Sequence, residues 1–329
     1  MNNIELIFPE IFISLSIMFL LILGVFKKDS SKIIHNISLL VLLITAVITF
    51  NETLSINPTS LFNESIIIDY LSSFMKIITL LAAFVVLLIS SNYLRTFKIF
   101  KIEYPILILS SVLGMMIMIS SNDLIVFYMG LELQSLALYV LATFNRDQLK
   151  SSEAGLKYFV LSALSSGLLL YGCSLIYGFT GSTNFNVIST QFNTNEYAIT
   201  FGIVFILVGL AFKISAVPFH MWAPDVYEGS PTSVTLFFTM VPKIAALTVF
   251  IRFLYVPFLN LIDQWQMILV FLSIASMLFG AIAAIGQKNL KRLIAYSSIS
   301  HIGYALAGLA TGSNEGIQSS VIYLSLIHI

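Results

Sequence analysis

The sequence predicts an all-α protein that crosses a membrane about ten or eleven times. Of its 329 residues, 58% are hydrophobic and only 10% are charged, whereas about 25% of the residues in a soluble domain carry a charge. Apolar stretches of about 20 residues, the length that spans the hydrocarbon core as a helix, recur along the chain. The cationic residues also gather in alternate connections, as in other polytopic membrane proteins.

Each expected helix is an apolar stretch bounded by a short polar connection. The first, IELIFPEIFISLSIMFLLILGVF, is long enough to span and is followed by charges, so it indicates a membrane helix and not a cleavable signal peptide. The same criterion places ten helices at 4–26, 33–50, 66–92, 104–121, 123–144, 154–179, 197–221, 232–255, 264–286 and 291–312. An eleventh begins near residue 315.

The distribution of Lys and Arg predicts the orientation. Twelve of the 16 fall after the first, third, fifth and ninth helices: Lys27, Lys28, Lys32, Arg95, Lys98, Lys101, Arg146, Lys150, Lys157, Lys288, Lys291 and Arg292. The opposite connections 51–65 and 180–196 contain no Lys or Arg. By the positive-inside rule, the basic side faces the cytoplasm or the mitochondrial matrix, and the N-terminus lies outside.

Several classes of chemistry are not expected in this chain. The net charge is zero, which argues against binding nucleic acid through bulk electrostatics. The single cysteine, Cys173, provides neither a disulfide framework nor a metal cluster. The sequence contains no phosphate-binding glycine loop and no nucleophile elbow. Redox chemistry or ATP hydrolysis would therefore occur in another chain, and we expect no cofactor or metal in this one.

Three ionisable residues lie deep inside predicted helices: Glu132, Lys213 and Lys243. Each costs about 2.5–3.5 kcal/mol at the centre of a membrane, so a partner or water must compensate. Similar depths permit a Glu132–Lys213 ion pair, with Lys243 as a partly hydrated amine. Burial favours the neutral form of an amine, and an amine that gains and loses a proton can act in a relay. One such residue alone could be structural, but three together favour a proton relay.

Two prolines accompany the buried lysines. Pro218 follows Lys213 by five residues, and Pro242 directly precedes Lys243. Proline has no N–H to donate, so we expect both to break their helices and to free carbonyls that line a hydrated path.

Other charged side chains and two histidines allow more than one interpretation. His220 is consistent with either a relay group or a helix cap, and His301 with either a relay group or packing. Lys76 can reach a lipid headgroup or pair with a neighbour. Arg252, near the end of its helix, is expected to reach the membrane interface.

Five motifs carry a resemblance to a known family. They are DLIVFYMGLELQSLALYVL, SSEAGLKYFVLSALSSGLLLYG, FKISAVPFHMWAPDVYEGSPT, VPKIAAL and NLKRLIAYSSISHIGYALAGLA. With them the chain closely resembles, over nearly its whole length, the antiporter-like subunits of respiratory complex I, the NADH-quinone oxidoreductase. The resemblance implies that Glu132, Lys213 and Lys243 form a proton path. It also implies that FMN, iron–sulfur clusters and quinone bind in other subunits and that the partners are other membrane-arm subunits.

The resemblance further implies fourteen helices, among them two inverted five-helix repeats with a broken seventh helix. Residues 1–103 would then hold three N-terminal helices, 104–255 the first repeat, and 256–329 the incomplete start of the second. We expect the natural protein to be longer, since the final LSLIHI (324–329) is what a common transposase sequencing adapter encodes. The expected location is a bacterial inner membrane or, alternatively, the mitochondrial inner membrane.

Two competing functions remain open at this point. Subunits of multisubunit cation/proton antiporters and of membrane-bound hydrogenases share the broken-helix module. A passive scaffold, in which the buried charges only hold helices together, belongs to a different class.

Overall fold

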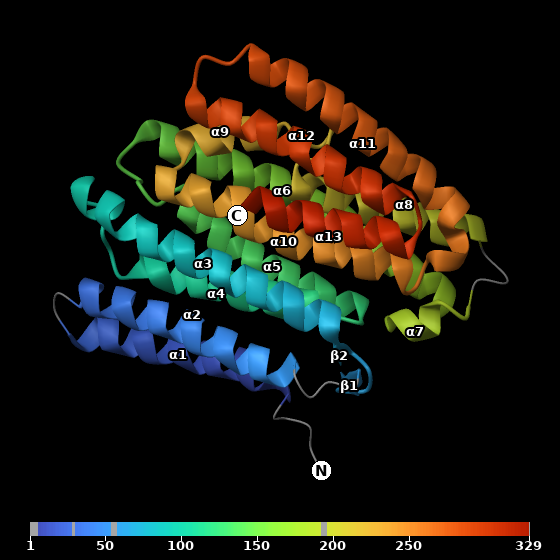
Figure 1. Cartoon of the computed structure of the whole chain (residues 1–329), viewed down its shortest axis with the longest axis horizontal. Helices are drawn as coiled ribbons and strands as arrows, with labels where there is room; N and C mark the ends of the chain where they lie inside the picture. Colours follow the sequence, from blue (N-terminus) through green and yellow to red (C-terminus); the bar gives the residue numbers. More distant parts are fainter. Residues whose placement is uncertain (1–5, 28–29, 54–57, 192–195, 329) are drawn as a thin grey trace. The chain divides into compact units, whose positions relative to one another are not determined.

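The computed structural model describes residues 6–27, 30–53, 58–191 and 196–328. Within them, the regular secondary structure is helical apart from one small hairpin (Figure 1). The elements are α1 Phe8–Phe26, α2 Ser31–Thr53, β1 Thr59–Leu61, β2 Ile66–Ile68, α3 Tyr70–Thr96, α4 Glu103–Ile119, α5 Leu124–Ala142, α6 Leu149–Thr180, α7 Phe185–Ile188, α8 Glu196–Ile214, α9 Trp222–Gly229, α10 Thr232–Tyr255, η2 Leu259–Leu261, α11 Ile262–Ile285, α12 Leu290–Ala310 and α13 Asn314–His328.

Among the described residues, 9 helices are long and apolar enough to cross a membrane, and α4 is a shorter apolar helix. The predicted all-α polytopic membrane fold is therefore confirmed.

The third long helix begins later than predicted, because a hairpin precedes it. Strand β1 pairs antiparallel with β2, with Thr59 opposite Ile68. Asp69 then caps α3: its carboxylate accepts a hydrogen bond from the Ser72 backbone N–H at 2.8 Å, and the Ser72 hydroxyl accepts one from the Asp69 N–H. This capping box satisfies N–H groups that a helix start leaves open. The expectation of a helix from residue 66 is wrong for 66–69.

The chain forms two compact units. Residues 1–155 and 230–248 belong to the first, and residues 156–229 and 249–329 to the second. Helices α6 and α10 therefore contribute to both units. The predicted boundaries at residues 103 and 255 separate the N-terminal helices from two internal repeats. Grouping residues into compact units does not test such repeats, so these boundaries stay a prediction.

In the first unit, α4 packs against α1, α2, α3 and α5. Helices α1 and α2 form an antiparallel pair at the blue end of the colour scale (Figure 1). A Cβ atom added to Gly114 on α4 would lie 2.5 Å from the Gln134 nitrogen and 2.7 Å from the Gly130 oxygen on α5. The two backbones can approach this closely only because Gly114 has no side chain.

In the second unit, α12 packs against α9, α11 and α13, and α8 packs against α11. A Cβ atom on Gly280 of α11 would lie 2.7 Å from the Ser300 nitrogen of α12. The Ser320 hydroxyl of α13 donates to the Ala305 carbonyl of α12 at 2.8 Å. Glycine contacts and side-chain hydrogen bonds to carbonyls therefore join these helices.

Helix α10 is the most enclosed of the long helices described, with 83% of its membrane-span window buried. Arg252, near its end, is only 4% exposed. Protein therefore encloses this side chain, and the expectation that Arg252 reaches the membrane interface stays a prediction.

Candidate functional site

Glu132 lies midway along α5, on a polar face of that helix. It is partly buried, and its Oε1 atom is buried without a hydrogen-bond partner among the described residues. Ser135, one turn later, is fully buried and donates to the Leu131 carbonyl at 2.7 Å. Tyr139, two turns after Glu132, is 7% exposed. A buried carboxylate oxygen with no donor is unfavourable, so this oxygen has the capacity to accept a hydrogen bond.

Lys243 lies within α10 and is 3% exposed. The predicted helix break at Pro242 is wrong, because α10 continues through this proline. Pro242 removes the donor that would reach the Phe238 carbonyl. The hydrogen bonds of the turns on either side keep the helix continuous, as in other membrane helices that contain proline.

Lys213 lies in the last turn of α8 and is 8% exposed. Its ammonium donates to the hydroxyl of Ser162, on α6, at 2.7 Å. A hydroxyl can both accept and donate a hydrogen bond, so Ser162 can hold the lysine in its charged or its neutral form. Sequence analysis missed Ser162, since nothing in the segment FVLSALSSG distinguishes this serine from the two that follow it.

The predicted interruption near Pro218 is present, and it begins after Ile214, one residue beyond Lys213. Ser215 has a φ of 64°, in the left-handed region. The Ser215 N–H donates to the Phe212 carbonyl at 3.0 Å, and the Ala216 N–H donates to the Ala211 carbonyl at 2.9 Å. This is the Schellman pattern that ends helices. The expected helix over 197–221 is therefore wrong beyond Ile214.

Backbone groups freed by this interruption find partners within the second unit. The Trp222 indole N–H donates to the Phe212 carbonyl at 2.8 Å. The Val217 N–H donates to the hydroxyl of Ser276, on α11, at 2.9 Å. Non-helical backbone at membrane depth requires such partners, and the short helix α9, which sequence analysis did not predict, begins at Trp222.

The two candidate histidines have different surroundings. His220 packs its ring against Phe279, with centroids 4.6 Å apart, and its Nδ1 is buried without a hydrogen-bond partner among the described residues. The Nδ1 of His301 forms a 2.9 Å hydrogen bond with the hydroxyl of Tyr323, on α13. The relay roles of both histidines stay predictions.

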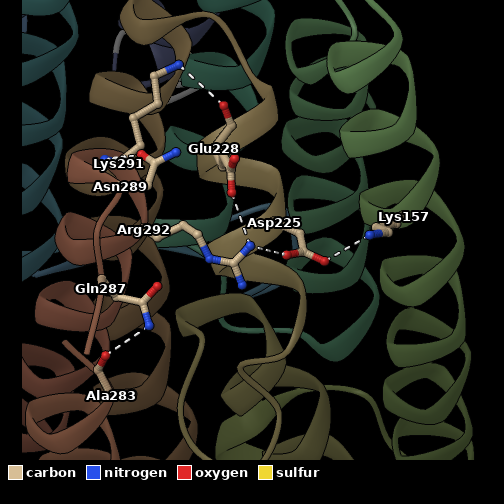
Figure 2. Close-up of polar contacts among 8 residues, drawn as sticks. All are labelled: Lys157, Asp225, Glu228, Ala283, Gln287, Asn289, Lys291 and Arg292. Atoms are coloured by element: carbon tan, nitrogen blue, oxygen red, sulfur yellow. Dashed lines mark hydrogen bonds and ion pairs between the residues drawn. The ribbon is translucent and has the colours of Figure 1, made fainter. Parts of the chain in front are cut away.

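A network of charges joins α6, α9 and α12 in the second unit. The Asp225 carboxylate on α9 contacts Lys157 of α6 at 2.9 Å and Arg292 of α12 at 3.0 Å (Figure 2). Arg292 also contacts Glu228 at 3.1 Å. Sequence analysis counted Lys157 and Arg292 among the basic residues of the connections between helices. It did not predict that they pair with Asp225 and Glu228. The network holds α9, the segment after the interruption, to two long helices.

The comparisons with known proteins identify the family. The sequence matches the family described as "NADH:quinone oxidoreductase/Mrp antiporter, TM" over residues 121–329. A Pelagibacter ubique protein named NADH-quinone oxidoreductase subunit N is 76% identical over 326 residues, which cover 99% of this chain and 69% of the relative. The chain belongs to the NADH-quinone oxidoreductase subunit N family. The resemblance found in the motifs is confirmed.

A second subunit N, from Parvibaculum lavamentivorans, is 52% identical over 321 residues, 96% of this chain and 66% of the relative. This member of the subunit N family thus spans about two thirds of the length of these relatives.

Two solved structures resemble this subunit N family member. The first is a chain of respiratory complex I from Thermus thermophilus with bound Aureothin, with a TM-score of 0.81 and 30% identity over 97% of this chain and 69% of that chain. The second is a chain of the membrane-bound sulfane sulfur reductase, an archaeal respiratory membrane complex. Its TM-score is 0.88, and it is 25% identical, with 99% of this chain and 69% of that chain covered.

The predicted relay residues of this subunit N family member lie in both compact units. Glu132 and Lys243 belong to the first, and Lys213 to the second together with both histidines. The Glu132–Lys213 ion pair stays a prediction.

Proposed function

We propose that this chain is a membrane-arm subunit of NADH-quinone oxidoreductase that translocates protons through Glu132, Lys213 and Lys243. NADH oxidation and quinone reduction occur in other subunits, which hold FMN, iron–sulfur clusters and quinone. The partners are neighbouring antiporter-like and small membrane-arm subunits and the lipid bilayer. The location is the bacterial inner membrane, with the N-terminus outside.

The observation that carries the proposal is the position of Lys213. This buried ammonium lies where α8 ends, and its hydrogen-bond acceptor is the Ser162 hydroxyl. A hydroxyl between an amine and water can pass a proton in either direction. A lysine fixed only for structure would not require a neighbouring interruption of the helix.

The mechanism couples charge movement to proton affinity. Quinone reduction displaces charge along the membrane arm and changes the Glu132–Lys213 pairing. That change alters the field at Lys243, which releases or takes up a proton. His220 and His301 are candidate further relay groups, and Pro218 keeps the path beside Lys213 from refolding as helix.

Identity to named proteins favours this function over its nearest competitor. The antiporter and hydrogenase subunits share the module, but two relatives with 76% and 52% identity are both named subunit N.

The decisive experiment measures protons pumped per NADH oxidised in proteoliposomes that contain the assembled enzyme. Lys213→Ala and Lys243→Ala each lower the number of protons pumped per NADH oxidised, because each removes a group that transfers protons. Lys288→Ala, which changes an exposed lysine, leaves it unchanged. NADH oxidation by an artificial acceptor controls for assembly. An unaltered proton stoichiometry in both buried-lysine variants would contradict the relay.

A second pair of variants separates the relay from a passive scaffold. Replacing Glu132 with Leu and Lys213 with Met removes both charges together, so no buried charge is left uncompensated. A scaffold would keep its activity after this exchange. If the two residues belong to a proton relay, the double variant loses proton pumping although the complex still assembles.

A further inference from the structure

Three aromatic rings of the second unit stack beside the hydrogen bond between Lys213 and Ser162. The Trp222 indole lies against the ring of Tyr158, with centroids 4.5 Å apart and an angle of 10° between the ring planes. It also stacks on the ring of Phe212, with centroids 5.6 Å apart and an angle of 27°. The three residues Tyr158, Phe212 and Trp222, here called the aromatic layer, are all buried.

The aromatic layer lies between this hydrogen bond and the charge network of Asp225. Tyr158 precedes Ser162 by four residues, so both side chains lie on one face of α6, with Tyr158 one turn nearer to the start of the helix. Lys157, which directly precedes Tyr158, pairs with Asp225 at 2.9 Å (Figure 2). From the start of α6 onward, the order is therefore charge network, aromatic layer and Lys213.

Two members of the layer offer no group that could pass a proton on. The side chain of Phe212 is a hydrocarbon, and the indole of Trp222 has one N–H donor and no acceptor. That N–H is occupied, because it donates to the Phe212 backbone carbonyl at 2.8 Å. Hydrophobic constrictions exclude water, so stacked rings at this position would interrupt a chain of water molecules that leads to Lys213.

The indole of Trp222 has space into which it can move. A cavity of about 170 Å³ adjoins Phe212 and Trp222, and its walls include Leu161, Leu168 and Val208. Since a cavity of about 150 Å³ holds a benzene molecule, this one has room for an aromatic ring. No helix covers residues 215–221, directly before Trp222. The indole can therefore leave the stack while α6 and α8 stay intact.

We propose that the aromatic layer is a barrier that closes the approach to Lys213 from the end of α6 that holds the charge network, and that Trp222 opens it by moving into the cavity. While the rings are stacked, the Lys213 amine exchanges no proton with the aqueous phase at that end. Opening breaks the hydrogen bond between Trp222 and Phe212 and admits water. The use of such a barrier rests on the proposed relay, whereas its presence can be measured without any proton movement.

Cysteine labelling of the assembled complex in membrane vesicles tests the barrier. Ser162→Cys, in a chain that also carries Cys173→Ala, places a thiol beside the Lys213 ammonium, which favours the reactive thiolate. A negatively charged methanethiosulfonate, which lipid excludes, is added at the face that holds the charge network, and mass spectrometry gives the labelling rate. With the layer intact, we expect this rate to be far below that of Lys288→Cys, at an exposed position. Adding Trp222→Ala is expected to raise it toward the exposed rate.

Trp265→Ala provides the matched control. Trp265 of α11 is also buried, and its indole N–H donates to the Phe258 backbone carbonyl at 2.8 Å. The change therefore removes the same ring and the same kind of hydrogen bond. Trp265 precedes Ser276, the residue of α11 that contacts the interrupted segment, by about three turns. Trp265→Ala should leave the labelling rate at position 162 unchanged.

A second variant covers the case in which Trp222→Ala prevents assembly. Phe212→Ala removes another ring of the layer and keeps the hydrogen bond of Trp222, whose acceptor is a backbone carbonyl, and the same rise in labelling is expected. The barrier is overturned if the intact layer already permits labelling at the rate of Lys288→Cys, or if neither ring deletion raises the rate. Both results are independent of proton pumping, so a failure of the barrier differs from a failure of the relay, which the proton stoichiometry of Lys213→Ala tests.

Discussion

The helix pairs α4–α5 and α11–α12 share one backbone framework and differ in the side chains that it carries. In each pair, a glycine of the first helix lies against backbone atoms of the second helix. Every residue in the second contact lies 166 positions after its counterpart in the first: Gly114 and Gly280, Gly130 and Tyr296, Gln134 and Ser300.

The helix caps follow the same spacing. Asp123 accepts a hydrogen bond from the Ile125 N–H at 2.8 Å at the start of α5. Asn289, again 166 positions later (289 − 123), accepts one from the Lys291 N–H at 2.9 Å at the start of α12. The spacing of 166 residues is therefore the same at the helix caps and at the glycine contacts, as two copies of one ancestral unit would produce.

The difference between the pairs lies in the polar residues. The spacing aligns Glu132 with Ser298 and Ser135 with His301. The acid of the proposed relay thus has a neutral counterpart, and a serine bonded to its own helix has a histidine counterpart bonded to α13. Close glycine packing is common to both pairs, and single polar side chains distinguish them.

The largest effect is expected from filling the glycine contacts. In Gly114→Ala, the new Cβ would meet backbone atoms at 2.5 and 2.7 Å, and in Gly280→Ala at 2.7 and 2.9 Å. Backbone cannot rotate away as a side chain can, so each change destabilises the subunit by about 3 kcal/mol, at the upper end of overpacking costs. Thermal dissociation of the subunit from the complex, followed by native electrophoresis, measures the loss.

Gly167 provides the matched control for these variants. It also lies in a long helix, but beyond its own stretch of helix no atom lies within 4 Å of a Cβ atom placed on it. Gly167→Ala should be neutral or slightly stabilising, because alanine favours helix. Equal losses at all three glycines would mean that the shared framework does not depend on close approach.

A smaller effect, on activity and not on stability, tests whether the chemistry belongs to one pair alone. Glu132→Ser gives α4–α5 the residue found in α11–α12 and lowers the number of protons pumped per NADH oxidised, because the proposed relay loses its acid. Adding Ser298→Glu returns a carboxylate to the aligned position of the other pair. Pumping measured in proteoliposomes is expected to stay low, because the proposed relay uses the acid of α5 and not one on α12. Recovery in the double variant would show that the two positions are interchangeable.

The parts of the site found from sequence are those that disturb an apolar pattern. Glu132, Lys213 and Lys243 are conspicuous because a charge inside an apolar run is costly whatever its partner. Ser162 is not conspicuous, because serines are common in membrane helices and because its hydrogen bond to Lys213 spans 51 residues of sequence. The Asp225 network was missed for the same reason, although its basic members had been located.

The two prolines show where a local rule fails. Proline removes one donor in either case, yet α10 continues through Pro242 while α8 ends before Pro218. The helix near Pro218 is ended by Ser215, whose left-handed backbone closes the Schellman pattern. Serine is not a typical residue for that conformation, so the sequence contained no reliable sign of it. In the same way, the apolar residues 66–68 fit a helix until Asp69 is seen to cap α3.

The smallest expected effect concerns His301, which distinguishes α11–α12 from the other pair. His301→Ser introduces the residue aligned at Ser135 and removes the hydrogen bond to Tyr323; Tyr323→Phe removes the same bond from the other side. Each change costs about 1 kcal/mol, the net value of one hydrogen bond. The double variant should cost less than the sum, since the bond can be lost only once. Tyr304→Phe, at a half-exposed neighbour, is the control and should be neutral in the same thermal dissociation assay. Additive losses would show that His301 and Tyr323 stabilise the subunit separately, and the contrast between the two helix pairs would then not depend on this contact.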